Sequence, residues 1–269
     1  MCRWAAYRGV PIPLEQIVSA PGHSLIDQSH CASQAKTATN GDGFGIAWYG
    51  DHPEPGLYRD ILPAWSDCNL RSLARQIRSP LFLAHVRAST GGATNRDNCH
   101  PFVHGRWSFM HNGQVAGFDR IRRKLESALS DRLYACRRGT TDSELMFLLA
   151  LEFGLDEAPE GALAEMIRFV ISAAKADGKA MLVRFTAALS DGETLYAIRY
   201  STDTHAPTLY SAPMCGGHGH CLVSEPFEDK DAKWHEIPAG SFVTVRDGGM
   251  SVRRFEPMRV ETVELAESA

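Results

Sequence analysis

The strongest constraint on the fold is a series of short apolar segments in the last third of the chain. Between residues 180 and 255 these segments are AMLVRFTAAL, TLYAIRY, TLYSA, HCLVS, SFVTVRD and MSVRRF. They alternate apolar with polar residues, and Gly, Asp or Pro separates one from the next. Alternation with a period of two is typical of strands, and turn residues between such runs are typical of hairpins. The pattern predicts a meander of antiparallel strands.

Helices and further strands are predicted upstream of this meander. The predicted strands are residues 44–49, 81–86 and 106–110, and the predicted helices are residues 118–129, 142–153 and 162–174. The second helix is apolar almost all round, which indicates burial, and it begins with TDSE, which has capping-box spacing. The stretch before residue 60 is otherwise rich in turn residues. Strands, then helices, then strands predict an α+β fold, and a four-layer αββα sandwich would bury two antiparallel sheets between helices.

Composition excludes several classes of function. The chain has 269 residues, of which 44% are hydrophobic, and a net charge of −4. We therefore expect a globular protein with a substantial core, and no electrostatic attraction to nucleic acid or to an anionic membrane. No run approaches the roughly 18 apolar residues of a membrane span, and no signal-peptide pattern opens the chain. The seven cysteines are odd in number and spread out, which indicates free thiols in a reducing cytoplasm.

The first candidate catalytic group lies in the opening segment, MCRW. If Met1 is removed, Cys2 carries a thiol and a free α-amine on one residue. An α-amine has an ordinary pKa of about 7.7–8.0, so it is partly neutral at physiological pH and can accept the thiol proton. Nucleophile and base then come from the same residue. The alternative is that a cysteine stands at position 2 by chance.

Asn112 and Gly113, within FMHNGQ, have two compatible interpretations. Asn-Gly after an apolar strand is a strong hairpin signal. The same pair could form an oxyanion hole, because an Asn amide and the next backbone N–H can both point at one developing negative oxygen. A turn at a strand end would hold both donors rigidly.

Two charged residues are candidates for binding an amino-acid head group. Arg87 follows a buried strand in LAHVRAST, where its charge is costly without an anionic partner. Its planar guanidinium suits a carboxylate, either of a ligand or of a structural ion pair. Asp142 lies in the first turn of a predicted helix, where the helix dipole favours an acid. It either stabilises that helix or holds a ligand ammonium group.

Two further patterns leave alternatives open. The glycines of NGDGFGIAWY (residues 40–49) match no phosphate-binding loop, and they indicate either a tight turn before a strand or a close approach to bound substrate. CGGHGHC contains four soft metal ligands, Cys215, His218, His220 and Cys221. They could bind zinc or copper, but their spacing is not that of a standard structural zinc site, and a Gly-rich loop between strands explains them as well.

Together, Cys2 and the motifs HVRAST, CHPF, HNG and TDSE, in this order and spacing, resemble the class II glutamine amidotransferases. These are N-terminal-nucleophile hydrolases with an αββα fold. The motifs HSLIDQS, NGDGFGIAWY, PAW and VSEPF make the chain most similar to one subgroup. This subgroup includes the amidotransferase-like subunit of the eukaryotic glutathione-degrading complex and the bacterial hydrolase of ergothioneine synthesis. The resemblance implies one domain over residues 2–255 and a C-terminal tail over residues 256–269.

The resemblance implies a catalytic role for three residues. Cys2 would be the N-terminal nucleophile, with its own amine as the general base. Asn112 and Gly113 would form the oxyanion hole. The implied reaction is cleavage of a γ-glutamyl amide bond, in glutamine or in a γ-glutamyl peptide or conjugate, through a thioester on Cys2 that releases glutamate.

The resemblance also implies a binding site for the γ-glutamyl head group. Arg87 would bind its α-carboxylate, with Thr90 nearby, and Asp142 would hold its α-ammonium. Three histidines would shape the pocket without acting as bases: His85, His100 and His111. No metal and no cofactor are implied.

Two departures from the family narrow the interpretation. Many members have a tryptophan after the motif arginine, but this chain has Ala88, which suggests a glutamyl pocket that is more open or is covered by a different lid. We also expect no synthase domain to receive ammonia, and therefore either a stand-alone hydrolase or a subunit that acts with a partner protein. The alternatives are a non-catalytic amidotransferase-like subunit and a metal-binding protein. The expected partner is a small γ-glutamyl substrate, and the expected location is the cytoplasm.

Overall fold

The computed structural model describes residues 2–34, 39–89, 94–176, 182–228 and 232–258 and, of Cys215, the backbone alone. The strands are β1 Arg3–Pro13, β2 Phe44–Trp48, β3 Gly56–Asp60, β4 Arg78–Val86, β5 Phe102–His104, β6 Trp107–Val115, β7 Val183–Ser190, β8 Leu195–Ser201, β9 Tyr210–Met214, β10 Gly219–Val223, β11 His235–Glu236, β12 Ser241–Arg246 and β13 Gly249–Arg254. The helices are α1 Glu15–Val18, α2 Leu25–His30, α3 Cys68–Gln76, α4 Phe118–Glu126, α5 Asp131–Cys136, α6 Asp142–Glu152 and α7 Pro159–Lys175.

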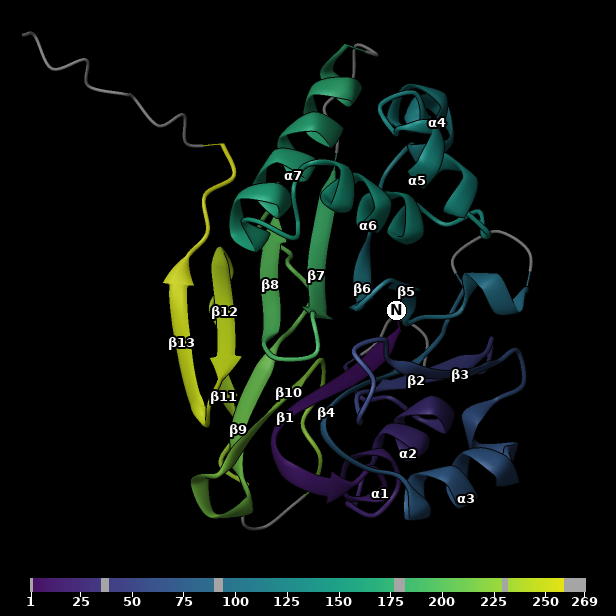
Figure 1. The fold of residues 1–269 in the computed structure, drawn as a ribbon, viewed down its shortest axis with the longest axis vertical. Helices are drawn as coiled ribbons and strands as arrows, with labels where there is room; N and C mark the ends of the chain where they lie inside the picture. The colour runs from purple at the N-terminus through teal and green to yellow at the C-terminus, as the bar shows by residue number, and fades with distance from the viewer. Residues whose placement is uncertain (1, 35–38, 90–93, 177–181, 229–231, 259–269) are drawn as a thin grey trace, which may run out of the picture.

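The strands form two antiparallel sheets (Figure 1). The seven-stranded sheet has the order β11-β9-β10-β1-β4-β2-β3, and the six-stranded sheet has the order β13-β12-β8-β7-β6-β5. Helices α1, α2 and α3 cover the outer face of the larger sheet, and α6 and α7 cover that of the smaller sheet (Figure 1). The fold is therefore the expected α+β arrangement in four layers.

Three clusters of buried apolar side chains lie between the four layers of secondary structure and stabilise their packing. Between the two sheets lie side chains such as Trp4, Leu83 and Met110. A second cluster lies between the larger sheet and α1–α3, and a third lies between the smaller sheet and α6–α7. Because each sheet buries both of its faces, most strands are apolar on both sides.

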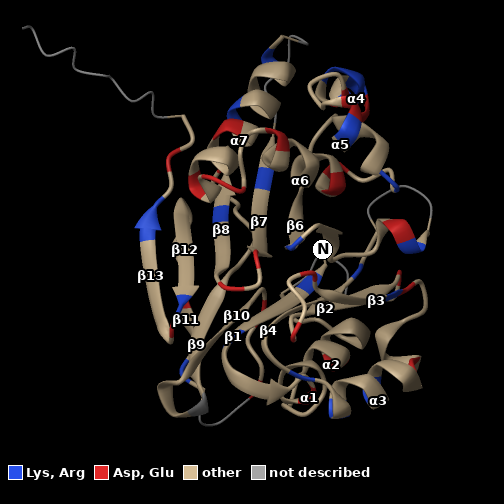
Figure 2. Ribbon diagram, viewed as in Figure 1, with Lys and Arg blue, Asp and Glu red and all other residues tan. Residues whose placement is uncertain are grey.

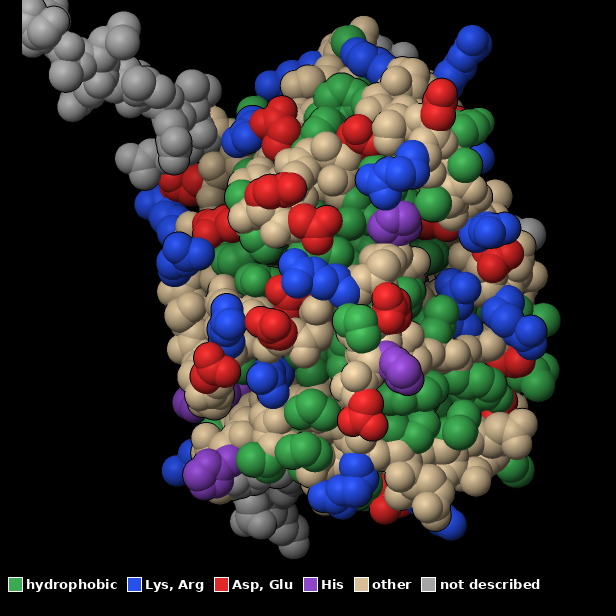
Figure 3. Space-filling view, in the orientation of Figure 1, with side chains coloured by type: hydrophobic (Ala, Val, Ile, Leu, Met, Phe, Trp, Pro, Cys, Tyr) green, Lys and Arg blue, Asp and Glu red, His purple; other side chains and the backbone are tan. Residues whose placement is uncertain are grey.

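Basic and acidic residues are interspersed along the elements (Figure 2). The same mixture covers the face shown in Figure 3, so the described side chains on that face form no concentrated basic patch. Within the described residues, no helix has both the length and the apolar character that crossing a bilayer requires.

Strand β1 is the element that sequence analysis missed. It lies at the centre of the larger sheet, where it pairs with β10 on one side and with β4 on the other. Trp4 and Ala6 face the second sheet, whereas Ala5 and Tyr7 face the helices, and all four are fully buried. A strand buried on both faces has no alternating pattern, so RWAAYRGV gave no signal with a period of two.

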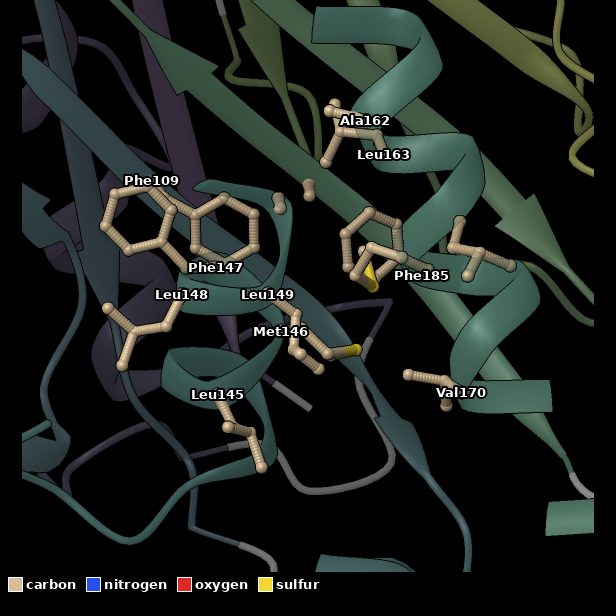
Figure 4. Close-up of a cluster of buried hydrophobic side chains, with 14 of the residues drawn as sticks. Phe109, Leu145, Met146, Phe147, Leu148, Leu149, Ala162, Leu163, Val170 and Phe185 are labelled. Carbon is tan, nitrogen blue, oxygen red and sulfur yellow. The ribbon is translucent and has the colours of Figure 1, made fainter. Parts of the chain in front are cut away.

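Helix α6 is confirmed as a buried helix and is anchored by aromatic packing (Figure 4). The rings of Phe109 in β6 and Phe147 in α6 stack with their centroids 5.2 Å apart. Complete burial of one such side chain contributes about 1.5–3 kcal/mol. This packing fixes α6 against β6, and it thereby places Asp142 at the start of α6 near the end of that strand.

Two local predictions need correction. Strand β6 continues through Asn112 and Gly113, which pair with β7, so the hairpin interpretation of Asn-Gly is wrong. At the start of α6, Thr141 Oγ1 accepts the N–H of Glu144 at 3.2 Å, as a capping box requires. The Glu144 carboxylate, however, accepts the N–H groups of Arg138 and Gly139 instead of closing the box.

Candidate active site

A cavity of about 580 Å³ opens at the N-terminal end of β1 and contains most of the predicted site residues. Its lining includes Cys2, Arg87, His100, His111, Asn112, Gly113 and Asp142. They come from β6, α6, the residue before β1 and the segments after β4 and before β5, which the two facing sheets bring together. His85 lies behind His100, and Thr90 falls outside the described residues.

Cys2 is held beside the residue that follows Arg87. Its Sγ accepts the N–H of Ala88 at 3.4 Å and lies 3.5 Å from the Ala88 carbonyl. This contact follows from the pairing of β1 with β4. Burial raises the pKa of the Cys2 thiol, although the Ala88 N–H and the charge of Arg87 act in the opposite direction. The thiol therefore keeps its proton at neutral pH and needs a base to become a nucleophile.

The three histidines are poorly suited to be that base. Burial, with the nearby charge of Arg87, lowers the pKa of His85 to about 3. Burial also lowers the pKa of His100 well below its ordinary value, and the rings of His85 and His100 stack 4.3 Å apart. The pKa of His111 is lowered by burial, with Asp142 opposing the shift. Neutral, weakly basic rings agree with the predicted pocket-shaping role.

Asn112 offers a buried, unpaired donor at the cavity, and Gly113 lies beside it. The Asn112 side chain is 2% exposed, and its Nδ2 has no hydrogen-bond partner among the described residues. A buried, unpaired donor costs about 1–3 kcal/mol, so it is expected to serve an acceptor that the substrate brings. Gly113 has φ +153°, and a Cβ there would overlap the carbonyl of Arg184 and lie 2.7 Å from Nε2 of His111.

Arg87 is buried and oriented by neutral groups. Its Nη1 donates to the carbonyl of Asp42 at 3.3 Å, and its Nη2 donates to Oγ of Ser89 at 3.2 Å. The Asp42 carboxylate accepts the N–H of Ser89 at 2.7 Å. Among the described residues no carboxylate forms an ion pair with Arg87. A structural ion pair with one of these residues therefore does not explain its burial. Its remaining N–H groups are available to a ligand carboxylate.

Asp142 is fixed by two hydrogen bonds at the cavity wall. Its Oδ2 accepts the N–H of Val115 at 3.0 Å, and its Oδ1 lies 3.2 Å from Oγ of Ser143. Ser143 Oγ also lies 2.9 Å from Nδ1 of His111, whose Nε2 donates to the carbonyl of Arg184 at 3.1 Å. The carboxylate keeps free lone pairs toward the cavity, where it can hold an ammonium group.

The glycines of NGDGFGIAWY serve a purpose that sequence analysis did not identify. A Cβ at Gly43 would lie 2.6 Å from Sγ of Cys99, and one at Gly45 would overlap the carbonyl of His100. These glycines let β2 approach the segment that carries His100, rather than a bound substrate. The same stretch contains Asp42, which orients Arg87. Asp42 and Ser89 were missed because their roles depend on a contact between distant segments.

The CGGHGHC segment forms the connection between β9 and β10. His220 and Cys221 are consecutive strand residues, so their side chains point to opposite faces of the sheet. Cys221 is fully buried in the outer core of that sheet, and burial raises its pKa strongly. His220 and Cys221 therefore cannot bind the same ion, and in the described part of the chain no group of three or more His, Cys, Asp or Glu residues could hold a metal.

Comparisons with known proteins find one family of related sequences. The profile of the family described as class II glutamine amidotransferases matches residues 23–214. The probable glutamine amidotransferase DUG3 of Saccharomyces cerevisiae is 32% identical over 91% of this chain and 82% of its own length. The gamma-glutamyl-hercynylcysteine sulfoxide hydrolase of Mycolicibacterium smegmatis is 31% identical over 94% of this chain and 99% of its own length.

Solved structures show the same fold. A glutamine aminotransferase class-II domain protein from Silicibacter pomeroyi has a TM-score of 0.75 and 42% identity, over 94% of this chain and 99% of that one. The glutamine phosphoribosylpyrophosphate amidotransferase of B. subtilis has a TM-score of 0.68 at 16% identity, over 96% of this chain and 50% of that one. At that identity the second similarity shows the fold alone.

Proposed function

Because this chain belongs to the class II glutamine amidotransferases, we propose that it hydrolyses the amide bond of a γ-glutamyl compound and releases glutamate. The observation that carries the proposal is the content of one cavity. It is lined by a thiol, two candidate oxyanion donors, a guanidinium and a carboxylate, from Cys2, Asn112, Gly113, Arg87 and Asp142. A relative whose name states that it hydrolyses a γ-glutamyl compound supports this reaction.

The γ-glutamyl head group is bound by opposite charges on the two sides of the cavity. The guanidinium of Arg87 donates a bidentate pair of hydrogen bonds to the α-carboxylate, and the Asp142 carboxylate binds the α-ammonium. Thr90 is proposed to add a hydroxyl donor near the carboxylate. This arrangement selects an α-amino acid with a free head group and directs its γ-carbonyl toward Cys2.

The reaction begins after removal of Met1, which frees the α-amine of Cys2. The amine takes the thiol proton as sulfur attacks the γ-carbonyl, and the resulting oxyanion is stabilised by Asn112 and Gly113. The C–N bond then breaks, and the ammonium returns its proton to the leaving nitrogen. Water next attacks the thioester while the amine takes one of its protons, and glutamate leaves as the thiol is restored.

We propose that the reaction takes place in the cytoplasm, because the scattered cysteines favour a reducing compartment. The protein acts either alone or with a partner subunit, within a domain proposed to span residues 2–255, followed by a tail. Residues 259–269 of that tail fall outside the described residues.

Intact mass tests the proposal directly. The purified protein is weighed before and after incubation with a glutamine-analogue diazoketone, alongside Cys2→Ala and, as a matched control, Cys31→Ala at an exposed cysteine. We expect loss of Met1, one adduct on Cys2, and no turnover of γ-glutamyl substrates by Cys2→Ala. A retained Met1, an adduct on another cysteine, or turnover by Cys2→Ala would contradict the mechanism and favour a non-catalytic subunit.

A further inference from the structure

A buried charged cluster lies beside Cys2, on the side of β1 away from Ala88. Arg3 directly follows the nucleophile, and its side chain is fully buried. Its Nη1 donates to the carbonyl of Ser224 and its Nη2 to the carbonyl of Gln34, each at 3.2 Å. Nη1 also lies 3.6 Å from Oε2 of Glu225, which is itself 2% exposed.

Glu225 is the centre of this cluster. Its Oε1 accepts from Nε2 of His23 at 2.6 Å and from the N–H of Ser33 at 2.7 Å. Its Oε2 accepts the N–H of Gln34 at 2.9 Å and faces Arg3. Although burial alone would raise the pKa of Glu225, these hydrogen bonds and the charge of Arg3 lower it. The carboxylate is therefore ionised at neutral pH.

The cluster joins two motifs to which the proposed mechanism gives no task, HSLIDQS and VSEPF. A buried ion pair gives little net stability, because desolvating two charges offsets their attraction. Its place next to the nucleophile points instead to a geometric role. The Ser224 hydroxyl accepts the N–H of Trp4 at 2.9 Å, and the Ser224 N–H donates to the Trp4 carbonyl at 3.0 Å. The same short segment thus holds both residues that follow Cys2.

Once Met1 is gone, Cys2 is the end of the chain and is held covalently only through Arg3. A terminal residue is free to rotate unless its neighbours are fixed, and small misplacements of reacting groups reduce rates strongly. The Arg3 side chain bridges the segment at 33–34 and the segment at 224–225, so it fixes the first peptide unit from both sides.

We propose that Glu225 is a positioning residue for the reaction, which acts through Arg3 and the backbone at Ser33 and Gln34 to orient the amine and thiol of Cys2. The inference rests on the proposed function of Cys2. It does not involve Arg87 or Asp142, so the binding of the head group is independent of it.

Glu225→Gln is the decisive variant because it keeps the shape of the side chain. An amide has one NH₂ end. Turned one way, that end faces Nε2 of His23 and the N–H of Ser33, and turned the other way it faces the N–H of Gln34 and the Arg3 guanidinium. Either orientation sets donors against donors.

We expect Glu225→Gln to lower kcat about tenfold or more, with KM changed less than about threefold. The rate at which Cys2 reacts with iodoacetamide should fall in parallel, and its pH dependence should shift. Both are measured well below the melting temperature. Glu225→Asp, which keeps the charge, should recover part of kcat. Glu228→Gln, at an exposed carboxylate nearby, is the matched control.

A kcat and a labelling rate within twofold of the wild type would overturn the inference, as would an effect on KM alone. If Glu225→Gln does not fold, Glu225→Asp decides by the same two measurements. Failure of the proposed function is distinguishable, because it is detected as a retained Met1, an adduct on another cysteine or turnover by Cys2→Ala, whatever Glu225→Gln does.

Discussion

The stacked pair of His85 and His100 should make the stability of this protein depend on pH. Both rings are buried, at 1% and 4% exposure, and none of their nitrogens has a hydrogen-bond partner among the described residues. His85 has a pKa of about 3 in the folded protein, against an ordinary value of 6.5. Between these two values the unfolded chain binds a proton that the folded chain does not. Stability therefore falls as the pH falls through this window.

The magnitude follows from the two pKa values of His85. At pH 5 the unfolded imidazole is almost fully protonated, whereas the folded ring stays neutral. Linkage then costs about 2 kcal/mol of unfolding free energy relative to pH 7. His85→Phe removes this titration together with the two unpaired ring nitrogens of His85, so it should be tolerated at neutral pH.

Urea denaturation at pH 7, 6 and 5 measures the effect on the wild type and on His85→Phe. We expect the wild type to lose about 2 kcal/mol more than the variant between pH 7 and pH 5. His52→Phe, which removes an exposed imidazole, controls for the chemical change. Equal losses in the wild type and in His85→Phe would refute the claim that burial keeps His85 neutral.

Three further substitutions test the site. Arg87→Ala should raise KM for γ-glutamyl substrates about tenfold or more in steady-state assays, because a charged hydrogen bond to the head group is lost. Arg75→Ala, at an exposed arginine, is the control. An unchanged KM in Arg87→Ala would show that Arg87 does not bind the α-carboxylate. Asn112→Ala should lower kcat about 10²- to 10³-fold with a smaller change in KM, and a normal kcat would show that the amide does not serve the oxyanion. Gly113→Ala should lower the melting temperature as well as kcat, because its Cβ would overlap the carbonyl of Arg184; a wild-type melting curve would argue against this backbone geometry.

The pattern of apolar residues was sufficient to predict the alternating strands and the helix that is apolar on all sides. The strands after residue 180 alternate clearly, and α6 is apolar all round, so both were predicted. Strand β1 was not, because RWAAYRGV neither alternates nor forms a continuous apolar run, since Arg3 and Arg8 interrupt it. The Asn-Gly hairpin was predicted and is wrong, because pairing of Asn112 and Gly113 with β7 overrides the local turn preference.

A site residue was predictable only where the short motif around it indicated the chemistry of that residue. Cys2, Arg87 and Asp142 stand in such motifs, and the structure places them around one cavity. Asp42 and Glu225 do not show their roles in the sequence. Each acts through hydrogen bonds to segments far away along the chain, and local spacing contains no information about such contacts.

The central position of β1 has a consequence for the order of events during synthesis. Ala5 pairs with Val223, so the first strand of the chain finds one of its two neighbours only among the last strands to leave the ribosome. Contacts of such high sequence separation form late. The N-terminus should therefore stay accessible to a methionine aminopeptidase for most of translation, and chains truncated before β10 should be processed at Met1 yet fail to react with a glutamine-analogue electrophile. The enzyme would thus acquire its terminal amine before it has an active site in which to use it.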